Sequence, residues 1–164
     1  MVKNKVFLLT LILILLIASG CSKKHVDTEN QNIQEKAVLY ENIDLGFRVF
    51  ESSQWNVGEE STNGSFNVTF ENNKLKAIVT ILTSEKSVDE IKNDLKTGTR
   101  KANIIQDTKD SLIFESERKE SIRTEIYIKD NRANKGIITF MTPVKDYENN
   151  KDAIDEFRRN LQFF

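Results

Sequence analysis

The chain contains few of the residues that ordinarily perform covalent chemistry. Among its 164 residues there is one cysteine, Cys21, and one histidine, His25. A single cysteine forms no internal disulfide and no cysteine-based zinc site. A single histidine in a polar segment lacks the fixed partners of a catalytic base, and no nucleophile-elbow or phosphate-binding glycine motif is present. We therefore expect no catalytic residues, no metal site and no cofactor, and the role of Cys21 becomes the first question.

The residues before Cys21 have the layout of an export signal. Lys3 and Lys5 form a short basic start, and an apolar run broken only by Thr10 follows over residues 6–18. This run is too short for a transmembrane helix, which needs about 20 apolar residues. Its length and its basic front are typical of a signal peptide.

The sequence "IASGC", residues 17–21, resembles the lipobox of bacterial lipoproteins, in which small residues precede an obligatory cysteine. Ala18 stands where that motif most often has Leu and is an accepted variant. The resemblance implies that residues 1–20 are removed and that Cys21 carries a diacylglyceryl group. It also implies a location on the extracytoplasmic face of a cell membrane. Two acyl chains on one residue anchor a protein stably. The alternatives are an uncleaved anchor helix and an ordinary secretory signal followed by a coincidental cysteine.

The charge of the chain argues against polyanionic partners. The net charge is −1, from 24 basic and 25 acidic residues, and removal of residues 1–20 would subtract two lysines and no acid. Such a chain has no electrostatic reason to bind nucleic acid or an anionic membrane surface. The expected partners are the membrane, through the lipid on Cys21, and an envelope protein.

A polar segment separates Cys21 from the rest of the chain. Residues 22–36 read "SKKHVDTENQNIQEK" and contain almost no apolar side chains, and His25 lies among them. This composition is typical of a flexible tether that spans roughly 20 Å. We assign residues 21–37 to the lipidated cysteine and its tether, and residues 38–164 to one domain.

Alternating apolar residues predict strands in the first part of this domain. Phe66, Val68 and Phe70 alternate with polar residues, and "KLKAIVTIL", residues 74–82, alternates in the same way. Asn72 and Asn73 lie between the two runs and predict a two-residue hairpin turn. Further strand-like runs are "LGFRVFES", "NIIQDT", "SLIFESE", "SIRTEIYIKD" and "KGIITFMT".

Two segments predict amphipathic helices. Ser87 and Glu90 form a capping box at the start of "SVDEIKNDLKTG", and Gly98 is the expected stop. The C-terminal segment, residues 146–164, repeats apolar side chains at steps of three and four, with Arg158 and Arg159 late in the helix, as the helix dipole favours. Its apolar residues are Tyr147, Ile154, Phe157, Leu161 and Phe164.

This order of elements predicts an α+β domain with a single antiparallel sheet packed by two amphipathic helices. The layout resembles the PsbP-like fold, and the local similarity lies in "LGFRVFESSQWNV" and "DEFRRNLQFF". Ser52 or Ser53 stands where that family often has Pro. The resemblance implies a fold and no particular activity.

The candidate binding residues in the domain are few. Trp55 is expected to be a core or rim anchor, with ligand binding as the alternative. Asp107 and Asp110 are the nearest approach to a calcium loop but lack its Gly and terminal Glu, so a polar connection between strands is the simpler interpretation. The charge-dense stretch 117–125 is expected to be a solvated hairpin tip and outer sheet face, or else a docking surface for a protein partner.

The sequence therefore favours a membrane-anchored, non-enzymatic binding or accessory domain of the cell envelope. One alternative is an envelope hydrolase that uses a pair of carboxylates, since 25 acidic residues make some pair inevitable. Another is a structural or stress-related lipoprotein that binds no small ligand.

Overall fold

The structure is a computed structural model that describes residues 36–52, 54–99, 102–131 and 134–164. Cys21, His25 and the proposed signal peptide and tether therefore lie outside the described residues, apart from the last tether residues. The strands of the described part are β1 (Val38–Asn42), β2 (Phe47–Phe50), β3 (Asn56–Ser61), β4 (Phe66–Asn72), β5 (Leu75–Leu82), β6 (Ala102–Asp107), β7 (Ser111–Ser116), β8 (Ile122–Asn131), β9 (Asn134–Pro143) and β10 (Leu161–Phe163). The helices are α2 (Val88–Gly98), the short 3-10 helix η1 (Val144–Asp146) and α3 (Tyr147–Asn160).

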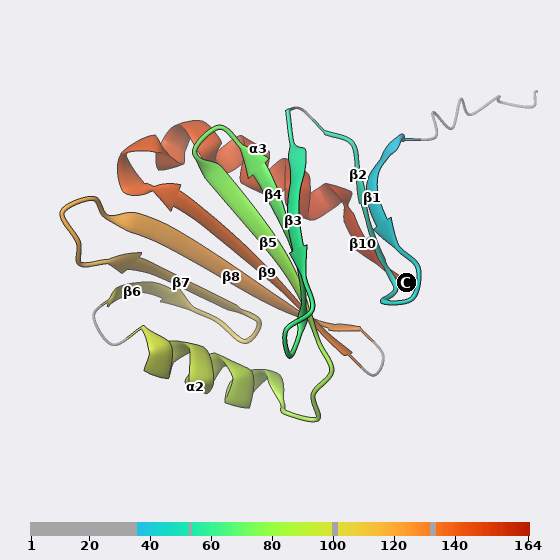
Figure 1. Cartoon of the computed structure of the whole chain (residues 1–164). Helices are drawn as coiled ribbons and strands as arrows, with labels where there is room; N and C mark the ends of the chain where they lie inside the picture. Colours follow the sequence, from blue (N-terminus) through green and yellow to red (C-terminus); the bar gives the residue numbers. More distant parts are fainter. Residues whose placement is uncertain (1–35, 53, 100–101, 132–133) are drawn as a thin grey trace, which may run out of the picture. The chain divides into compact units, whose positions relative to one another are not determined.

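The strands form two antiparallel sheets (Figure 1). The larger sheet has seven strands in the order β3-β4-β5-β9-β8-β7-β6, and the smaller has three in the order β1-β2-β10. The predicted α+β class with an antiparallel sheet and two helices is confirmed. The sequence predicted a single sheet and did not reveal the small one. Its strands β2 and β10 come from segments more than a hundred residues apart, so local patterns do not show that they pair.

The two helices pack on opposite faces of the large sheet, as Figure 1 shows. Strand β9 illustrates the division, because Ile137 packs with Ile91 of α2 whereas Ile138 and Phe140 belong to the core beneath α3. Successive residues of a strand point to opposite faces, so one strand supplies both cores. Among the described segments, neither helix has the length and apolar content that crossing a membrane requires.

Phe157 of α3 lies at the centre of the larger core and is fully buried. Its ring centroid lies 4.7 Å from that of Trp55, 5.1 Å from that of Phe70 and 5.6 Å from that of Phe140. These rings come from α3, the segment before β3, and strands β4 and β9. Edge-on and tilted aromatic contacts of this kind add to the gain from burial, so Phe157 fixes α3 on the sheet.

The predicted hairpin between β4 and β5 is confirmed. The register runs from Phe66 opposite Ile81 to Asn72 opposite Leu75. Asn73 has a φ of 53°, in the left-handed region that asparagine tolerates. The turn is therefore one residue later than predicted, because Asn72 still pairs in the ladder.

The predicted start of α2 is also confirmed. The backbone N–H of Glu90 donates to Oγ of Ser87 over 3.2 Å, and the N–H of Ser87 donates to Oε2 of Glu90 over 2.7 Å. Both halves of the capping box are thus formed. At the other end Gly98 is the last helical residue, and Thr99 provides the C-cap.

The predicted extension of the C-terminal helix to Phe164 is wrong. Helix α3 ends at Asn160, and Leu161 adopts an extended conformation with ψ of 122°. Leu161 then pairs with Val49 of β2, and Phe163 pairs with Phe47. The free edge of β2 satisfies the backbone of these residues, so tertiary pairing overrides their helical spacing.

Gly136 of β9 makes room for the small sheet. A Cβ atom at this position would lie 2.6 Å from Cε1 of Phe163. Any larger residue must displace the aromatic ring, so the glycine makes room for the side chain of Phe163 against β9.

We expect Gly136→Ala to lower the free energy of unfolding by about 1–3 kcal/mol, because it overpacks the contact with Phe163. Gly98→Ala is the matched control, since nothing lies within 4 Å of its added Cβ. In that helical position alanine should raise stability by up to about 1 kcal/mol. Urea unfolding of the two variants measures both effects, and equal stabilities would contradict the close contact.

Candidate functional site

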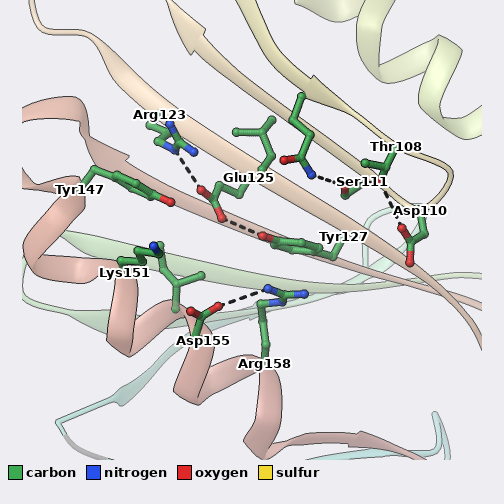
Figure 2. Close-up of a pocket in the computed structure, with 13 residues that line it drawn as sticks. Thr108, Asp110, Ser111, Arg123, Glu125, Tyr127, Tyr147, Lys151, Asp155 and Arg158 are labelled. Atoms are coloured by element: carbon green, nitrogen blue, oxygen red, sulfur yellow. Dashed lines mark hydrogen bonds and ion pairs between the residues drawn. The ribbon is translucent and has the colours of Figure 1, made fainter.

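A polar cavity of about 400 Å³ lies between α3 and the β6–β8 end of the large sheet (Figure 2). We call it the α3 pocket. Helix α3 and the sheet line it from two sides. The lining residues are Gln106, Thr108, Asp110, Ser111, Ile113, Arg123, Glu125, Tyr127, Tyr147, Lys151, Ile154, Asp155 and Arg158.

The helical repeat places the α3 residues on one side of the pocket. Tyr147, Lys151, Asp155 and Arg158 follow one another at steps of four, four and three. Residues with this spacing share a helix face. The adjacent stripe, which includes Phe157, enters the core, so the packing of the core also sets the direction of the pocket residues.

Strand alternation supplies the opposite wall. Arg123, Glu125 and Tyr127 of β8 face α3, as Figure 2 shows, whereas Ile126 and Ile128 join the core under α2. The strand predicted for this run is confirmed, and its residues alternate between the two faces of the sheet. The interpretation of residues 117–125 as a solvated tip and outer face is wrong for its second half, because α3 covers Glu125 and leaves only 4% of it exposed.

Glu125 is the centre of a hydrogen-bond network. Its Oε1 accepts from Nε of Arg123 over 2.9 Å, and its Oε2 accepts from the hydroxyl of Tyr127 over 2.8 Å. The side chain of Tyr147, in the first turn of α3, points toward the same carboxylate, whose negative charge acts on it (Figure 2). A buried carboxylate is costly unless it is paired and hydrogen-bonded. The network therefore connects β8 to the first turn of α3.

This environment favours the neutral form of both tyrosines. Burial raises the pKa of Tyr127 well above its ordinary value, and the hydrogen bond to Glu125 raises it further. The pKa of Tyr147 is raised by burial and by the negative charge of Glu125. Burial and the neighbouring anion both disfavour the ionised form of each hydroxyl, which raises its pKa.

Two arginines are held flat against these tyrosine rings. The guanidinium carbon of Arg123 lies 3.8 Å from the ring centroid of Tyr147, and that of Arg158 lies 3.7 Å from the ring centroid of Tyr127. Nη1 of Arg158 also donates to Oδ1 of Asp155 over 3.3 Å. Stacked guanidinium groups keep donors free at their edges, so the pocket presents oriented cationic donors.

The turn between β6 and β7 contributes hydroxyl groups. The hydroxyl oxygens of Thr108 and Ser111 lie 2.5 Å apart, and Nε2 of Gln106 donates to Ser111 over 3.3 Å. The hydroxyl of Thr108 also donates to Oδ1 of Asp110 over 3.2 Å. These contacts fix a row of groups that both donate and accept hydrogen bonds.

A buried lysine connects this turn to α2 on the other face. Lys92 is only 6% exposed, and its Nζ pairs with Oδ1 of Asp107 over 2.5 Å and donates to the carbonyl of Thr108. Asp107 also pairs with Lys96. The hydrogen bond from Lys92, followed by that from Lys96, lowers the pKa of Asp107. Helix α2 thereby holds the start of the turn that lines the α3 pocket.

The charges in the α3 pocket balance. Arg123, Lys151 and Arg158 are cationic, whereas Asp110, Glu125 and Asp155 are anionic. The balance favours a polar ligand without net charge, either uncharged or zwitterionic, over a simple ion. Among the described residues no group of three or more His, Cys, Asp or Glu is placed to hold a metal ion.

The structure separates the two acids that resembled a calcium loop. Asp107 pairs with the lysines of α2, whereas Asp110 lines the α3 pocket on the other side of the sheet. The two belong to a polar connection between strands, because Asp107 ends β6 and Asp110 lies in the turn before β7.

Trp55 lies in the core, with 5% of its surface exposed and its ring against Phe157. It is absent from the lining of the α3 pocket. The placement fits the anchor interpretation, and burial leaves the ring little surface for the ligand-binding alternative. Cys21, the candidate lipid-attachment residue, lies outside the described residues.

Sequence reasoning overlooked the pocket residues themselves. Arg123, Glu125 and Tyr127 alternate along a strand, but the sequence does not show that a helix covers them. The one available signal was the polar stripe of Lys151, Asp155 and Arg158 beside the apolar stripe of the C-terminal helix.

Comparison with known proteins establishes the fold and leaves the activity open. The sequence matches no protein-family model and no curated protein. The solution structure of cyanobacterial PsbP (CyanoP) from Synechocystis is similar, with a TM-score of 0.53, 13% identity, and coverage of 76% of this chain and 91% of that one. The chain therefore has a PsbP-like fold, as its sequence predicts.

Two further structures are more distant. A Bacteroides thetaiotaomicron protein gives a TM-score of 0.44 at 20% identity, with 72% of this chain and 45% of that chain covered. LpqN, involved in cell envelope biogenesis of Mycobacterium tuberculosis, gives 0.42 at 9% identity, with 71% and 82% covered.

The raised tyrosine pKa values predict a loss of stability in alkali. The unfolded chain releases tyrosine protons near about pH 10, whereas the folded chain retains the protons on Tyr127 and Tyr147. Their contribution to stability is therefore complete below that pH and is lost as the pH rises through the folded pKa values. Tyr127→Phe should reduce the slope of unfolding free energy against pH above about pH 10.

Urea unfolding at several alkaline pH values measures this slope for the wild type and for Tyr127→Phe. The two proteins differ only at this residue, so the difference between the slopes reports Tyr127. An unchanged slope in Tyr127→Phe would contradict the assignment, as would tyrosinate absorbance appearing in the folded wild type near about pH 10 for all its tyrosines.

Proposed function

We propose that the protein is a lipid-anchored domain of the cell envelope that binds a small polar molecule in the α3 pocket without transforming it. The observation that carries the binding function is the network around Glu125, which fixes charged and hydroxyl groups around one cavity. The lipid anchor is proposed from the sequence around Cys21.

Preorganisation is the main physical support for binding. The stacked arginines and the Thr108–Ser111 hydroxyl pair are already ordered by contacts within the protein. A ligand that meets ordered groups loses less free energy to side-chain ordering. Lys151 has no ion pair among the residues that the structure describes, so its ammonium is available to a ligand.

The chemistry of the lining defines the ligand class. Charges of both signs and several hydroxyl groups suit a saccharide or a zwitterion, which offers donors and acceptors together. A strongly anionic ligand would have to approach three carboxylates, and a strongly cationic one would have to approach three basic groups. Either ligand would be repelled by the groups of like charge, whereas a ligand without net charge would not.

The hydrogen bonds that Glu125 accepts within the protein support a binding role in preference to a catalytic one. Both of its oxygens accept hydrogen bonds from groups of the protein. A carboxylate engaged in this way holds the pocket lining in place and is not directed at a substrate.

A carboxylate hydrolase remains the competing proposal because Asp110 and Asp155 reach the same cavity as Glu125. It requires two acids on either side of a scissile bond, one of them acting as a proton donor. Slow cleavage of a bound oligosaccharide that Asp155→Asn abolishes would favour the hydrolase over the binding module.

The proposed anchor is a diacylglyceryl group on Cys21. Between it and the first described residue, Lys36, the chain is polar, and such a tether would let the domain reach ligands roughly 20 Å from the membrane. The lipid rather than surface charge would hold the protein, because the whole chain is slightly acidic.

Ligand binding can be tested with the full chain in discs of zwitterionic phospholipid. Calorimetric titration with N-acetylglucosamine oligomers and with free amino acids covers the uncharged and zwitterionic classes. Lys151→Ala and Asp155→Asn should each weaken the ligand that binds by about tenfold or more, since each removes a charged hydrogen-bond partner.

Lys109→Ala and Glu148→Gln are the matched controls, because both residues are exposed and absent from the pocket lining. They should leave affinity unchanged. If no probe of either class binds, the alternative of a structural lipoprotein without a small ligand replaces the binding proposal.

The anchor makes a separate prediction for Cys21→Ala. Mass spectrometry of the wild-type protein extracted from membranes should show a chain that begins at Cys21 and carries acyl groups. The Cys21→Ala variant should retain residues 1–20 and incorporate no labelled palmitate, because the thiol that receives the lipid is gone. Ser22→Ala is the control and should be lipidated normally. An unmodified Cys21 in the wild type would overturn the anchor.

A further inference from the structure

A second cavity, of about 610 Å³, lies beside the end of β9, where the chain leads through η1 into α3. Three connections meet there: the β4–β5 turn, the β7–β8 turn and η1. We call it the lysine-rimmed pocket. Its lining residues include Lys74, Lys119, Lys145, Ile122, Pro143 and Val144.

The floor of this pocket is apolar and only partly covered. Ile122 and Pro143 face each other at the end of the β8–β9 ladder, and Val144 follows directly. All three side chains are half-buried. The β8–β9 strand pairing ends at Ile122 and Pro143, and the chain then enters η1, so these side chains lie at the end of the sheet in the described part of the chain.

The backbone around the floor is already hydrogen-bonded within the protein. The N–H of Ile122 donates to Oγ of Ser116 over 3.0 Å, and the N–H of Val144 donates to the carbonyl of Ser121 over 3.0 Å. The hydroxyl of Ser121 donates to the carbonyl of Ser116 over 2.7 Å. The floor therefore offers apolar contact, and polar recognition falls to the rim.

The rim is basic although the chain as a whole is slightly acidic. Three lysines surround the cavity, and Glu120 is the acid among the lining residues. Lys74 makes a long ion pair of 3.5 Å with Asp146, and its side chain remains 67% exposed. Lys119 and Lys145 have no ion pair among the residues that the structure describes.

The floor and the rim together define the chemistry of an occupant. An apolar chain would cover Ile122, Pro143 and Val144, while an anionic group at its end would reach the ammonium groups of the lysines. The cavity volume lies within the range of small-ligand pockets, about 300–1,000 Å³. A cationic amphiphile would match only the apolar floor, and an anion without an apolar chain would match only the basic rim.

We propose that the lysine-rimmed pocket binds an anionic amphiphile, an apolar chain that ends in a carboxylate or a phosphate. This site is separate from the α3 pocket and shares none of its lining residues. Failure of one site in the experiments therefore leaves the other unaffected.

The test uses the full chain in discs of zwitterionic phospholipid and a fatty acid that carries a photoactivatable diazirine. After illumination, mass spectrometry should locate the label on peptides that contain Ile122 or Val144. The double variant Lys119→Ala/Lys145→Ala should reduce this labelling by about tenfold, since two charged partners of the head group are lost. Lys109→Ala/Lys129→Ala removes the same charge from exposed sites outside the pocket and should leave labelling unchanged.

Competition distinguishes the head groups and the competing explanations. Excess decanoate or decyl phosphate should suppress labelling. If decanoate competes more strongly, the natural head group is a carboxylate; if decyl phosphate competes more strongly, it is a phosphate. Inorganic phosphate and decyltrimethylammonium should not suppress it. Labelling that is spread over the surface, that survives loss of both lysines, or that the cationic amphiphile suppresses equally well would overturn the proposal.

Discussion

The buried carboxylate of Glu125 constrains the whole α3 side of the sheet. Because an unpaired charge in this position would be strongly destabilising, donors from Arg123 and Tyr127 converge on it, and the ring of Tyr147 packs against Arg123. Tyr147 begins α3, so its contact with Arg123 links the carboxylate network to the start of the helix. The position of one charged side chain thus determines the width and the polarity of the α3 pocket.

Apolar packing acts on the same helix from its other side. Phe157 inserts between rings from three distant segments, and the close-packed core permits little rotation of α3 about its axis. Since Lys151, Asp155 and Arg158 are fixed to that axis, core packing aims them at the pocket. Stability and binding therefore depend on a single helix orientation.

The two cavities of the domain differ in the charge and polarity of their lining residues. The α3 pocket has balanced charges and is suited to a ligand without net charge, whereas the lysine-rimmed pocket combines an apolar floor with unbalanced positive charge. The difference arises from where strands end. In mid-strand, α3 covers Glu125, whose charge pairs with Arg123 of the same strand, whereas Ile122 and the nearby lysines lie where the β8–β9 pairing ends.

The sequence by itself determined the local features, namely the β4–β5 hairpin, the capping box of Ser87 and Glu90, the alternation along β8 and the α+β class, because each depends on neighbouring residues. It also carries the lipobox around Cys21, which stays a prediction. Only the tertiary structure decided that Leu161 leaves the helix to pair with Val49, that α3 buries Glu125, and that Asp107 and Asp110 face opposite sides of the sheet. These outcomes depend on contacts between residues far apart in the chain, where burial and pairing outweigh local propensity.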